Sequence, residues 1–175
     1  MQKRPFFPLG RLWLFHCIAA LAFIWVTFAA NQVQSALQVD VLELSGVIAP
    51  FTAQYVIRGI ETAEADGAQA VIIQLDTPGG LLNSTDDIIK KILDSRVPVI
   101  VYVAPRGARA GSAGVFITMA AHIAAMAPTT NIGAAHPVSS EGKDIPQDLR
   151  EKVTNDAIAR LQALATTRGR MVGRA

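Results

Sequence analysis

The feature that most constrains the fold is a buried strand that leads, through a loop of small residues, into an apolar helix. Residues 97–103 form a short run rich in valine and isoleucine, closed by Pro105 and Gly107, which predicts a buried parallel strand. The apolar residues at 115–120 suit a buried helix better than a second strand. Repeated units of strand, loop and helix build parallel sheets, so we expect an α/β protein.

Ser112 lies where the small-residue loop meets the predicted helix. Unpaired backbone N–H groups and the positive end of the helix dipole favour an anion formed beside such a serine. The small neighbours Gly111, Ala113 and Gly114 would leave room for the backbone of a substrate. On this motif alone, however, an ordinary N-cap is the commoner role of a serine before a helix. A second feature has to decide between the two.

That feature is the turn Pro78-Gly79-Gly80, which follows another apolar strand at residues 70–75. Two adjacent glycines let the backbone point N–H groups into a site, which is how an oxyanion hole is built without side chains. The turn is weak evidence alone, because Pro-Gly-Gly closes many strands. Together with the serine junction it indicates a site for acyl transfer.

The remaining segments continue the alternation of strands and helices. We expect further strands at 39–47, 123–126 and 131–133, and further helices at 52–65, 81–93 and 148–167. The helix at 81–93 should bury its isoleucines and expose its charges, with Ile88, Ile89 and Ile92 inward and Asp86, Asp87, Lys90 and Lys91 outward. The last helix should bury Leu149, Val153, Ala157, Leu161 and Leu164. The polar residues 136–147 predict a mobile loop.

The N-terminal segment predicts export. Residues 1–11 are basic and residues 12–30 are almost entirely apolar, which is typical of a signal peptide or a single membrane anchor. The basic flank predicts a cytoplasmic N-terminus and a translocated body. We therefore expect an export or anchor segment at 1–36 and one domain at 37–175, membrane-anchored or periplasmic (extracytoplasmic).

Charge and cysteine content exclude several classes of function. The chain has 16 Lys and Arg against 14 Asp and Glu, and Lys3, Arg4 and Arg11 belong to the N-terminal segment, so the domain is nearly neutral. This balance argues against a nucleic-acid partner. The single cysteine, Cys17, lies in the apolar segment, and no histidine cluster has the spacing of a zinc site. We expect no metal and no cofactor.

Three motifs in order resemble a known family: residues 76–80 (Asp-Thr-Pro-Gly-Gly), 107–114 and 128–133. The chain from about 38 to 170 is similar to the protease domain of NfeD-type membrane-bound serine proteases, relatives of signal peptide peptidase A and the Clp protease. The resemblance implies a Clp/crotonase-like superhelix of β-β-α/βαβ units with a mainly parallel sheet. In that family more protease domain, membrane spans and often a small β-barrel domain follow, so we expect a chain truncated at its C-terminus.

The resemblance also implies the roles of individual residues. Ser112 would be the nucleophile and Lys152, near the start of the last helix, the base of a Ser-Lys dyad. The N–H groups of Gly80 and Ala113 would form the oxyanion hole. Three further glycines would contact the substrate: Gly79, Gly111 and Gly114.

The choice of base stays open at this point. A lysine accepts a proton only when neutral, which burial away from carboxylates favours. His136, followed by Pro137, is a rival because Clp subunits carry a histidine at nearly this distance after their serine, but no aspartate is clearly placed to complete a triad. Lys143, in the predicted loop, is a weaker rival.

The expected function is a membrane-associated serine endopeptidase that cleaves hydrophobic segments of membrane proteins, with a stomatin-like partner implied by the resemblance. We also expect a homo-oligomer, a dimer or larger. One alternative is a catalytically inert scaffold or binding module on the same fold. A crotonase-type acyl-CoA enzyme also uses paired backbone N–H groups, but an exported chain would not meet acyl-CoA.

Overall fold

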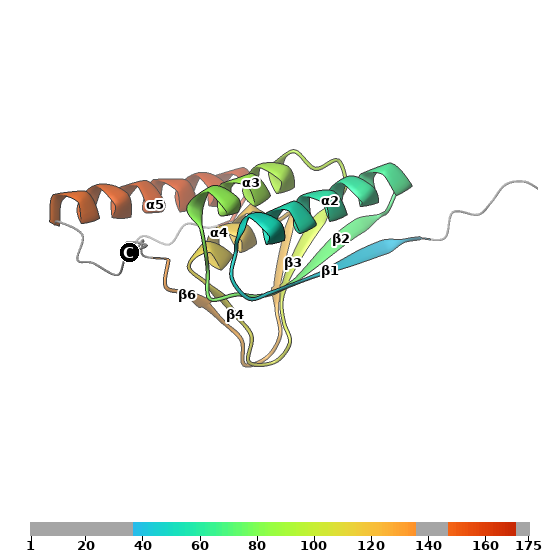
Figure 1. Ribbon diagram of the computed structural model, residues 1–175, viewed down its shortest axis with the longest axis horizontal. Helices are drawn as coiled ribbons and strands as arrows, with labels where there is room; N and C mark the ends of the chain where they lie inside the picture. Colours follow the sequence, from blue (N-terminus) through green and yellow to red (C-terminus); the bar gives the residue numbers. More distant parts are fainter. Residues whose placement is uncertain (1–36, 136–146, 171–175) are drawn as a thin grey trace, which may run out of the picture. The chain divides into compact units, whose positions relative to one another are not determined.

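The computed structural model describes residues 37–135 and 147–170. Within these ranges the chain forms a parallel sheet of four strands in the order β1-β2-β3-β5, and a pair of short strands, β4 and β6 (Figure 1). The expectations for residues 1–36, His136, Lys143 and the loop at 136–146 lie outside the described residues. Within the described part of the chain, no helix is both long and apolar enough to cross a membrane.

The four-stranded sheet consists of β1 (Val39–Ser45), β2 (Ala70–Asp76), β3 (Val99–Val103) and β5 (Ile123–Met126). Each strand pairs in parallel with the next strand of this sheet along the chain. Since the order runs steadily in one direction, right-handed crossovers place the connecting helices on a single face. These helices are α2 (Pro50–Asp66), α3 (Leu82–Leu93) and α4 (Ala113–Ala120), seen above the sheet in Figure 1. The mainly parallel α/β architecture expected from the sequence is confirmed.

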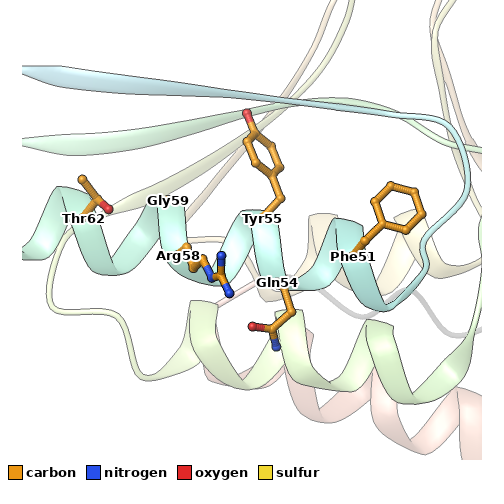
Figure 2. A pocket seen from close by; sticks show the side chains of 6 residues that line it. All are labelled: Phe51, Gln54, Tyr55, Arg58, Gly59 and Thr62. Carbon is orange, nitrogen blue, oxygen red and sulfur yellow. The ribbon is translucent and has the colours of Figure 1, made fainter.

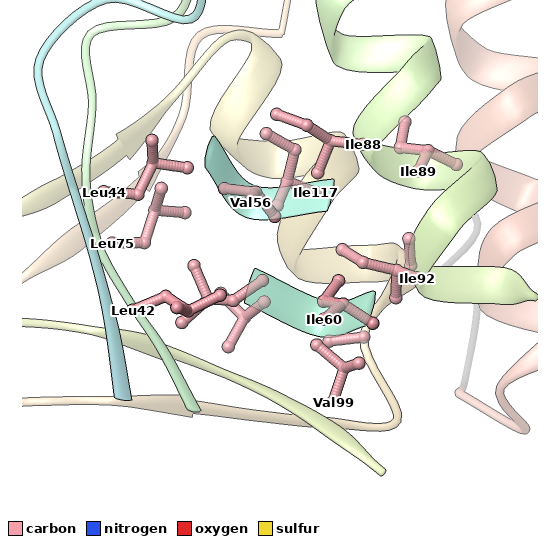
Figure 3. Close-up of a cluster of buried hydrophobic side chains, with 14 of the residues drawn as sticks. Leu42, Leu44, Val56, Ile60, Leu75, Ile88, Ile89, Ile92, Val99 and Ile117 are labelled. Carbon is pink, nitrogen blue, oxygen red and sulfur yellow. The ribbon is translucent and has the colours of Figure 1, made fainter. Parts of the chain in front are cut away.

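The core lies between the sheet and these helices (Figure 3). Leu44, Ile73 and Val101 contribute from the strands, and Ile60 and Ile88 from α2 and α3. Isoleucine, valine and leucine dominate the core, as is typical of strands in a parallel sheet. Burying each of these side chains stabilises the fold by about 1.5–3 kcal/mol relative to exposure.

The first strand distributes its apolar residues over both faces. Leu42 and Leu44 are buried under α2, whereas Val39 and Val41 are 46% and 57% exposed on the opposite face. Successive side chains of a strand point to opposite faces, so only one alternating set can reach the core. The predicted strand at 39–47 ends at Ser45, and Pro50 begins α2, where its missing N–H costs nothing.

Residues 109–111, expected to be loop, form a strand instead. β4 (Arg109–Gly111) pairs in parallel with β6 (Asn131–Gly133), which the sequence did predict. Thr77 also bridges to Ala110. The backbone ahead of Ser112 is buried at Ala110 and Gly111, and buried N–H and C=O groups must find partners. These partners lie far away in the sequence, so no local sequence pattern predicts the strand.

The last helix, α5 (Gln147–Thr167), packs through its second half. Ala157 and Leu164 are buried, but Leu149 is 51% exposed, contrary to the expected apolar side. The charges of α3 also depart from the prediction in part. Asp86 pairs with Arg160 of α5, and Lys91 pairs with Glu64 of α2 at 2.9 Å, whereas Asp87 and Lys90 are exposed as expected. These ion pairs link neighbouring helices and could not be inferred from one helix alone.

Candidate active site

Ser112 occupies the N-cap position of α4, but it is not an ordinary N-cap. Its side chain makes no capping hydrogen bond, and its backbone has φ 48° and ψ −107°. Residues with a side chain rarely adopt such a conformation, which costs on the order of 1–3 kcal/mol and persists only where the surroundings enforce it. No hydrogen bond joins the Ser112 hydroxyl to the described residues. Within the described part of the chain, the Ser112 hydroxyl is therefore not used to cap the helix.

Two chain segments enforce this backbone conformation. The Ser112 N–H donates to the Gly133 carbonyl of β6 at 2.9 Å, and the Ser112 carbonyl accepts from the Val115 N–H at 3.0 Å. Just before it, the Gly111 N–H donates to the Thr77 carbonyl at 2.9 Å. The serine junction is thus held from β6, from the end of β2 and from the first turn of α4.

The Pro-Gly-Gly turn lies directly against Ser112. A side chain added at Gly79, where φ is +117°, would come within 2.7 Å of the Ser112 Cβ and 3.2 Å of its Oγ. The structure therefore brings together the two motifs that the sequence places about thirty residues apart. Gly79 is needed both for its φ and for this close approach.

The other glycines of the site are crowded by the protein itself. A Cβ at Gly80 would lie 2.1 Å from the Ile48 carbonyl oxygen, and one at Gly111 would lie 3.0 Å from the Pro78 carbonyl oxygen. At Gly114 it would meet the Thr77 Cγ2 at 2.8 Å. Gly111 and Gly114 were predicted to contact the substrate, and Gly80 to supply an oxyanion donor. In the structure, the direction in which each side chain would point is already filled.

Two N–H groups near Ser112 have no backbone partner among the described residues. Neither Gly80 nor Ala113 donates to a main-chain carbonyl there. Ala113 is the first residue of α4, where N–H groups have no acceptor within the helix. The Gly79 carbonyl, by contrast, accepts from the Ile48 N–H at 2.9 Å. Two free donors beside a serine are the components of an oxyanion hole.

The sequence analysis missed two residues that build this junction. The Asp76 carboxylate accepts from the Arg109 N–H at 3.0 Å, and the fully buried Thr77 accepts from the Gly79 N–H at 3.0 Å. Both precede the Pro-Gly-Gly turn, so their position in the motif was the available signal. They connect the end of β2 to the strand that leads into Ser112.

Lys152 is exposed near the start of α5, and among the described residues no hydrogen bond or ion pair joins it to Ser112. The Ser-Lys dyad therefore stays a prediction. The second half of α5 is well anchored: the Arg168 Nε donates to the Ala120 carbonyl at 2.7 Å, and the Arg170 Nη2 donates to the Ala121 carbonyl at 2.9 Å. Arg160 also lies over the Phe116 ring, 5.5 Å from its centroid.

Among the described residues, the pKa values of Glu64, His122 and Arg170 are shifted, and burial together with the nearby Arg168 lowers that of Arg170. Burial and the nearby Arg168 lower the pKa of His122, whose Nδ1 accepts from the Val99 N–H at 3.1 Å. Burial would raise the pKa of Glu64, but the Arg96 N–H, which donates to it, and the ion pair with Lys91 lower the pKa overall. Among residues 37–135 and 147–170, no group of three His, Cys, Asp or Glu side chains could hold a metal ion.

A pocket lies apart from this junction, on the outer side of α2 (Figure 2). All its lining residues come from α2: Phe51, Gln54, Tyr55, Arg58, Gly59 and Thr62. Phe51 is 74% exposed. None of these residues belongs to the serine junction, so this pocket contributes no side chain to the candidate site.

The fold and the serine junction define a Clp-like α/β domain. The chain belongs to the family of NfeD1b N-terminal domains, whose model matches residues 38–173. It is 40% identical to the membrane-bound protease PH1510 of Pyrococcus horikoshii over 153 residues, which are 86% of this chain and 34% of that protein. It is 36% identical to the membrane protein NfeD1b of Bacillus subtilis over 95 residues, 54% of this chain and 21% of that protein. The chain therefore spans about a third or less of these relatives.

Solved structures of a protease N-terminal domain resemble this chain. A serine-to-alanine mutant described as the 1510-N membrane-bound stomatin-specific protease matches with a TM-score of 0.69 and 41% identity, over 76% of this chain and 65% of that one. A lysine-to-alanine mutant of the same protease, in complex with a substrate peptide, matches with a TM-score of 0.66 and 41% identity, over 73% and 59%. Relatives of this chain are thus named proteases and membrane-bound proteins.

Proposed function

We propose that this domain is a serine endopeptidase in which Ser112 is the nucleophile and Lys152 the general base. The observation that carries the proposal is the geometry of Ser112. Its hydroxyl does not cap α4, its backbone is held at φ 48°, and the Gly79–Gly80 turn lies against it. A serine used only as a cap would need none of these features. Relatives named as proteases, studied as serine and lysine mutants, support the same assignment.

The proposed reaction uses two steps. Neutral Lys152 takes the proton of the Ser112 hydroxyl as its oxygen attacks the scissile carbonyl, and the N–H groups of Gly80 and Ala113 stabilise the resulting oxyanion. The protonated lysine then gives its proton to the leaving amine. Water, activated by the same lysine, hydrolyses the acyl-enzyme. Substrate backbone would pass beside Gly79, Gly111 and Gly114.

The proposed substrate is a hydrophobic segment of a membrane protein, with a stomatin-like partner. One relative is described as stomatin-specific, and another structure of that protease contains a substrate peptide. We further propose that residues 1–36 act as a signal peptide or membrane anchor, that residues 37–175 form the exported protease domain, and that the protein is a homo-oligomer, a dimer or larger. No cofactor takes part in this reaction.

A catalytically inert scaffold is the second candidate, and one observation favours it. Lys152 is exposed, and no hydrogen bond or ion pair among the described residues joins it to Ser112, whereas a general base must come within hydrogen-bond reach of the proton that it takes. His136, outside the described residues, is the alternative base of a Ser-His peptidase. The scaffold and the peptidases share the same fold and the same position of Ser112. They differ only in how reactive the Ser112 hydroxyl is.

Labelling with a fluorophosphonate probe separates these candidates. The probe phosphonylates a serine only when a base and an oxyanion hole activate it. We expect the 175-residue chain to be labelled and the Ser112→Ala variant not to be labelled, at equal stability in urea unfolding. Absence of labelling in the folded chain would favour the scaffold.

A further inference from the structure

We infer that Thr77 is a positioning residue that orients the Gly80 N–H, one donor of the oxyanion hole. The inference rests on the proposed function of Ser112 and goes beyond it, because Thr77 belongs to neither the motif glycines nor the dyad. Thr77 is fully buried, at 0% exposure, between the Pro-Gly-Gly turn and α4.

The hydroxyl of Thr77 contacts both polar groups of one residue in the turn. Its Oγ1 accepts from the Gly79 N–H at 3.0 Å and donates to the Gly79 carbonyl at 3.3 Å. The Ile48 N–H donates to the same carbonyl at 2.9 Å. The direction of the Gly79 carbonyl is thereby fixed from two sides.

The direction of this carbonyl decides where the Gly80 N–H points. Both groups belong to the peptide bond between Gly79 and Gly80, which is planar, and in a trans peptide the N–H points opposite to the carbonyl. A pair of glycines has little conformational preference of its own, so the orientation must come from contacts. Thr77 and Ile48 supply those contacts. The Gly80 N–H has no main-chain acceptor among the described residues, and in the proposed site it is the donor that serves the Ser112 side.

Thr77 also connects this turn to the serine. Its N–H donates to the Arg109 carbonyl at 2.7 Å and its carbonyl accepts from the Gly111 N–H at 2.9 Å, both in the strand that leads to Ser112. Its methyl group fills the space beside Gly114 in α4, where an added Cβ would lie 2.8 Å from Cγ2. The side chain of Thr77 therefore orients the proposed oxyanion donor, and the backbone of Thr77 holds the strand that leads to the proposed nucleophile.

The test compares Thr77→Val with Thr77→Ser. Valine keeps the shape and the methyl group but lacks the hydroxyl, whereas serine keeps the hydroxyl. Thr52→Val is the matched control, because the buried Thr52 contacts Ala49 in the same way, accepting from its N–H at 2.7 Å and donating to its carbonyl at 2.8 Å, at the start of α2. All three variants are made in the 175-residue chain and assayed where each is fully folded.

We measure kcat and KM for a p-nitrophenyl ester and the rate of fluorophosphonate labelling. Thr77→Val should lower kcat and the labelling rate at least about tenfold, within the range seen when oxyanion donors are lost, with KM changed less than about twofold. Thr77→Ser should stay within about threefold of the parent chain, and Thr52→Val should lose stability without losing kcat. Equal kcat in Thr77→Val and the parent, or an equal fall in Thr52→Val, overturns the inference.

Amide hydrogen exchange tests the same inference without requiring catalysis. In Thr77→Val the amide of Gly79, which loses its acceptor, should exchange at least about tenfold faster than in the parent, while Thr77→Ser and Thr52→Val leave it unchanged. A parent chain that is unlabelled by fluorophosphonate but shows this exchange pattern would refute the peptidase and keep the positioning role. Unchanged exchange in Thr77→Val would refute the positioning role, whatever the activity.

Discussion

The serine junction and the first half of α5 each supply one residue of the proposed dyad, and they are built very differently. Ser112 is held by hydrogen bonds with Gly133 of β6 and Val115 of α4, and the preceding Gly111 is held by Thr77, in a backbone conformation that the surroundings enforce. Lys152 projects from exposed helical turns, where Leu149 is 51% exposed. The C-terminal part of α5 and the residues that follow it are held by Arg160, Arg168 and Arg170.

The difference between the two regions indicates which part of the proposed site is fixed by the fold. The proposed nucleophile and oxyanion donors are held by backbone hydrogen bonds to neighbouring segments. The proposed base, Lys152, lies on an exposed part of a helix. Substitution of Lys152 should therefore change activity without changing stability. Substitution of a glycine of the serine junction should lower stability.

The largest expected effect is on activity alone. Lys152→Ala should lower turnover by roughly a thousandfold or more, since no base remains, while the free energy of unfolding changes by less than about 0.5 kcal/mol because the side chain is exposed. Lys152→Arg should not restore activity, because a guanidinium keeps its proton. Ester hydrolysis and urea unfolding measure the two quantities.

The control for this prediction is His136→Ala, which should retain activity. With a lysine base, activity should increase on the alkaline side. With a histidine base, activity would instead rise with pH up to about pH 6–7. An inactive His136→Ala together with an active Lys152→Ala would assign the base to the histidine.

The next effect is on the stability of the serine junction. Gly80→Ala places a Cβ 2.1 Å from the Ile48 carbonyl oxygen, a backbone atom that cannot move cheaply, and should lower the free energy of unfolding by about 3 kcal/mol. Gly107→Ala is the matched control. Its φ of +84° is also unfavourable, but the space around it is open, so about 1 kcal/mol is expected. Equal losses would mean that the turn is not packed as described.

A smaller effect concerns the fastened end of α5. Arg168→Ala removes the hydrogen bond to the Ala120 carbonyl at the end of α4 and should cost about 1–2 kcal/mol. Limited proteolysis should then cut α5 earlier, since its second half would resemble its exposed first half. Arg58→Ala, an exposed arginine on α2, is the control and should change stability by less than about 0.5 kcal/mol.

The smallest effect is a pH dependence of stability near the same end of α5. Burial and Arg168 lower the pKa of His122 in the folded state, so protonation favours the unfolded chain. The contribution of neutral His122 to the free energy of unfolding is complete above the pKa of the unfolded state, about 6.5, and is lost as pH falls through the lower pKa of the folded state. The free energy of unfolding changes by at most about 1.4 kcal/mol per pH unit in this range. Urea unfolding between pH 7.5 and 5 should show a weaker dependence in His122→Asn and in Arg168→Ala. An unchanged dependence in both variants would rule out His122 as its source.

The amino-acid sequence was enough to predict the order of strands and helices and to single out the serine junction as the candidate site. Runs of valine and isoleucine marked the buried strands, and most predicted elements agree with the structure within a few residues, including Ile123–Met126 and Asn131–Gly133. Ser112 and the Pro-Gly-Gly turn were identified because their roles depend on local backbone freedom, which residue type alone reveals.

Only the tertiary structure decided what surrounds these residues. The strand at Arg109–Gly111 exists because β6 and Thr77 pair with it from distant parts of the chain. The glycines are required by contacts with Ile48, Pro78 and Thr77, and Lys152 is exposed. Local patterns report the preferences of the backbone, whereas close approach and burial depend on segments that meet only in the folded chain.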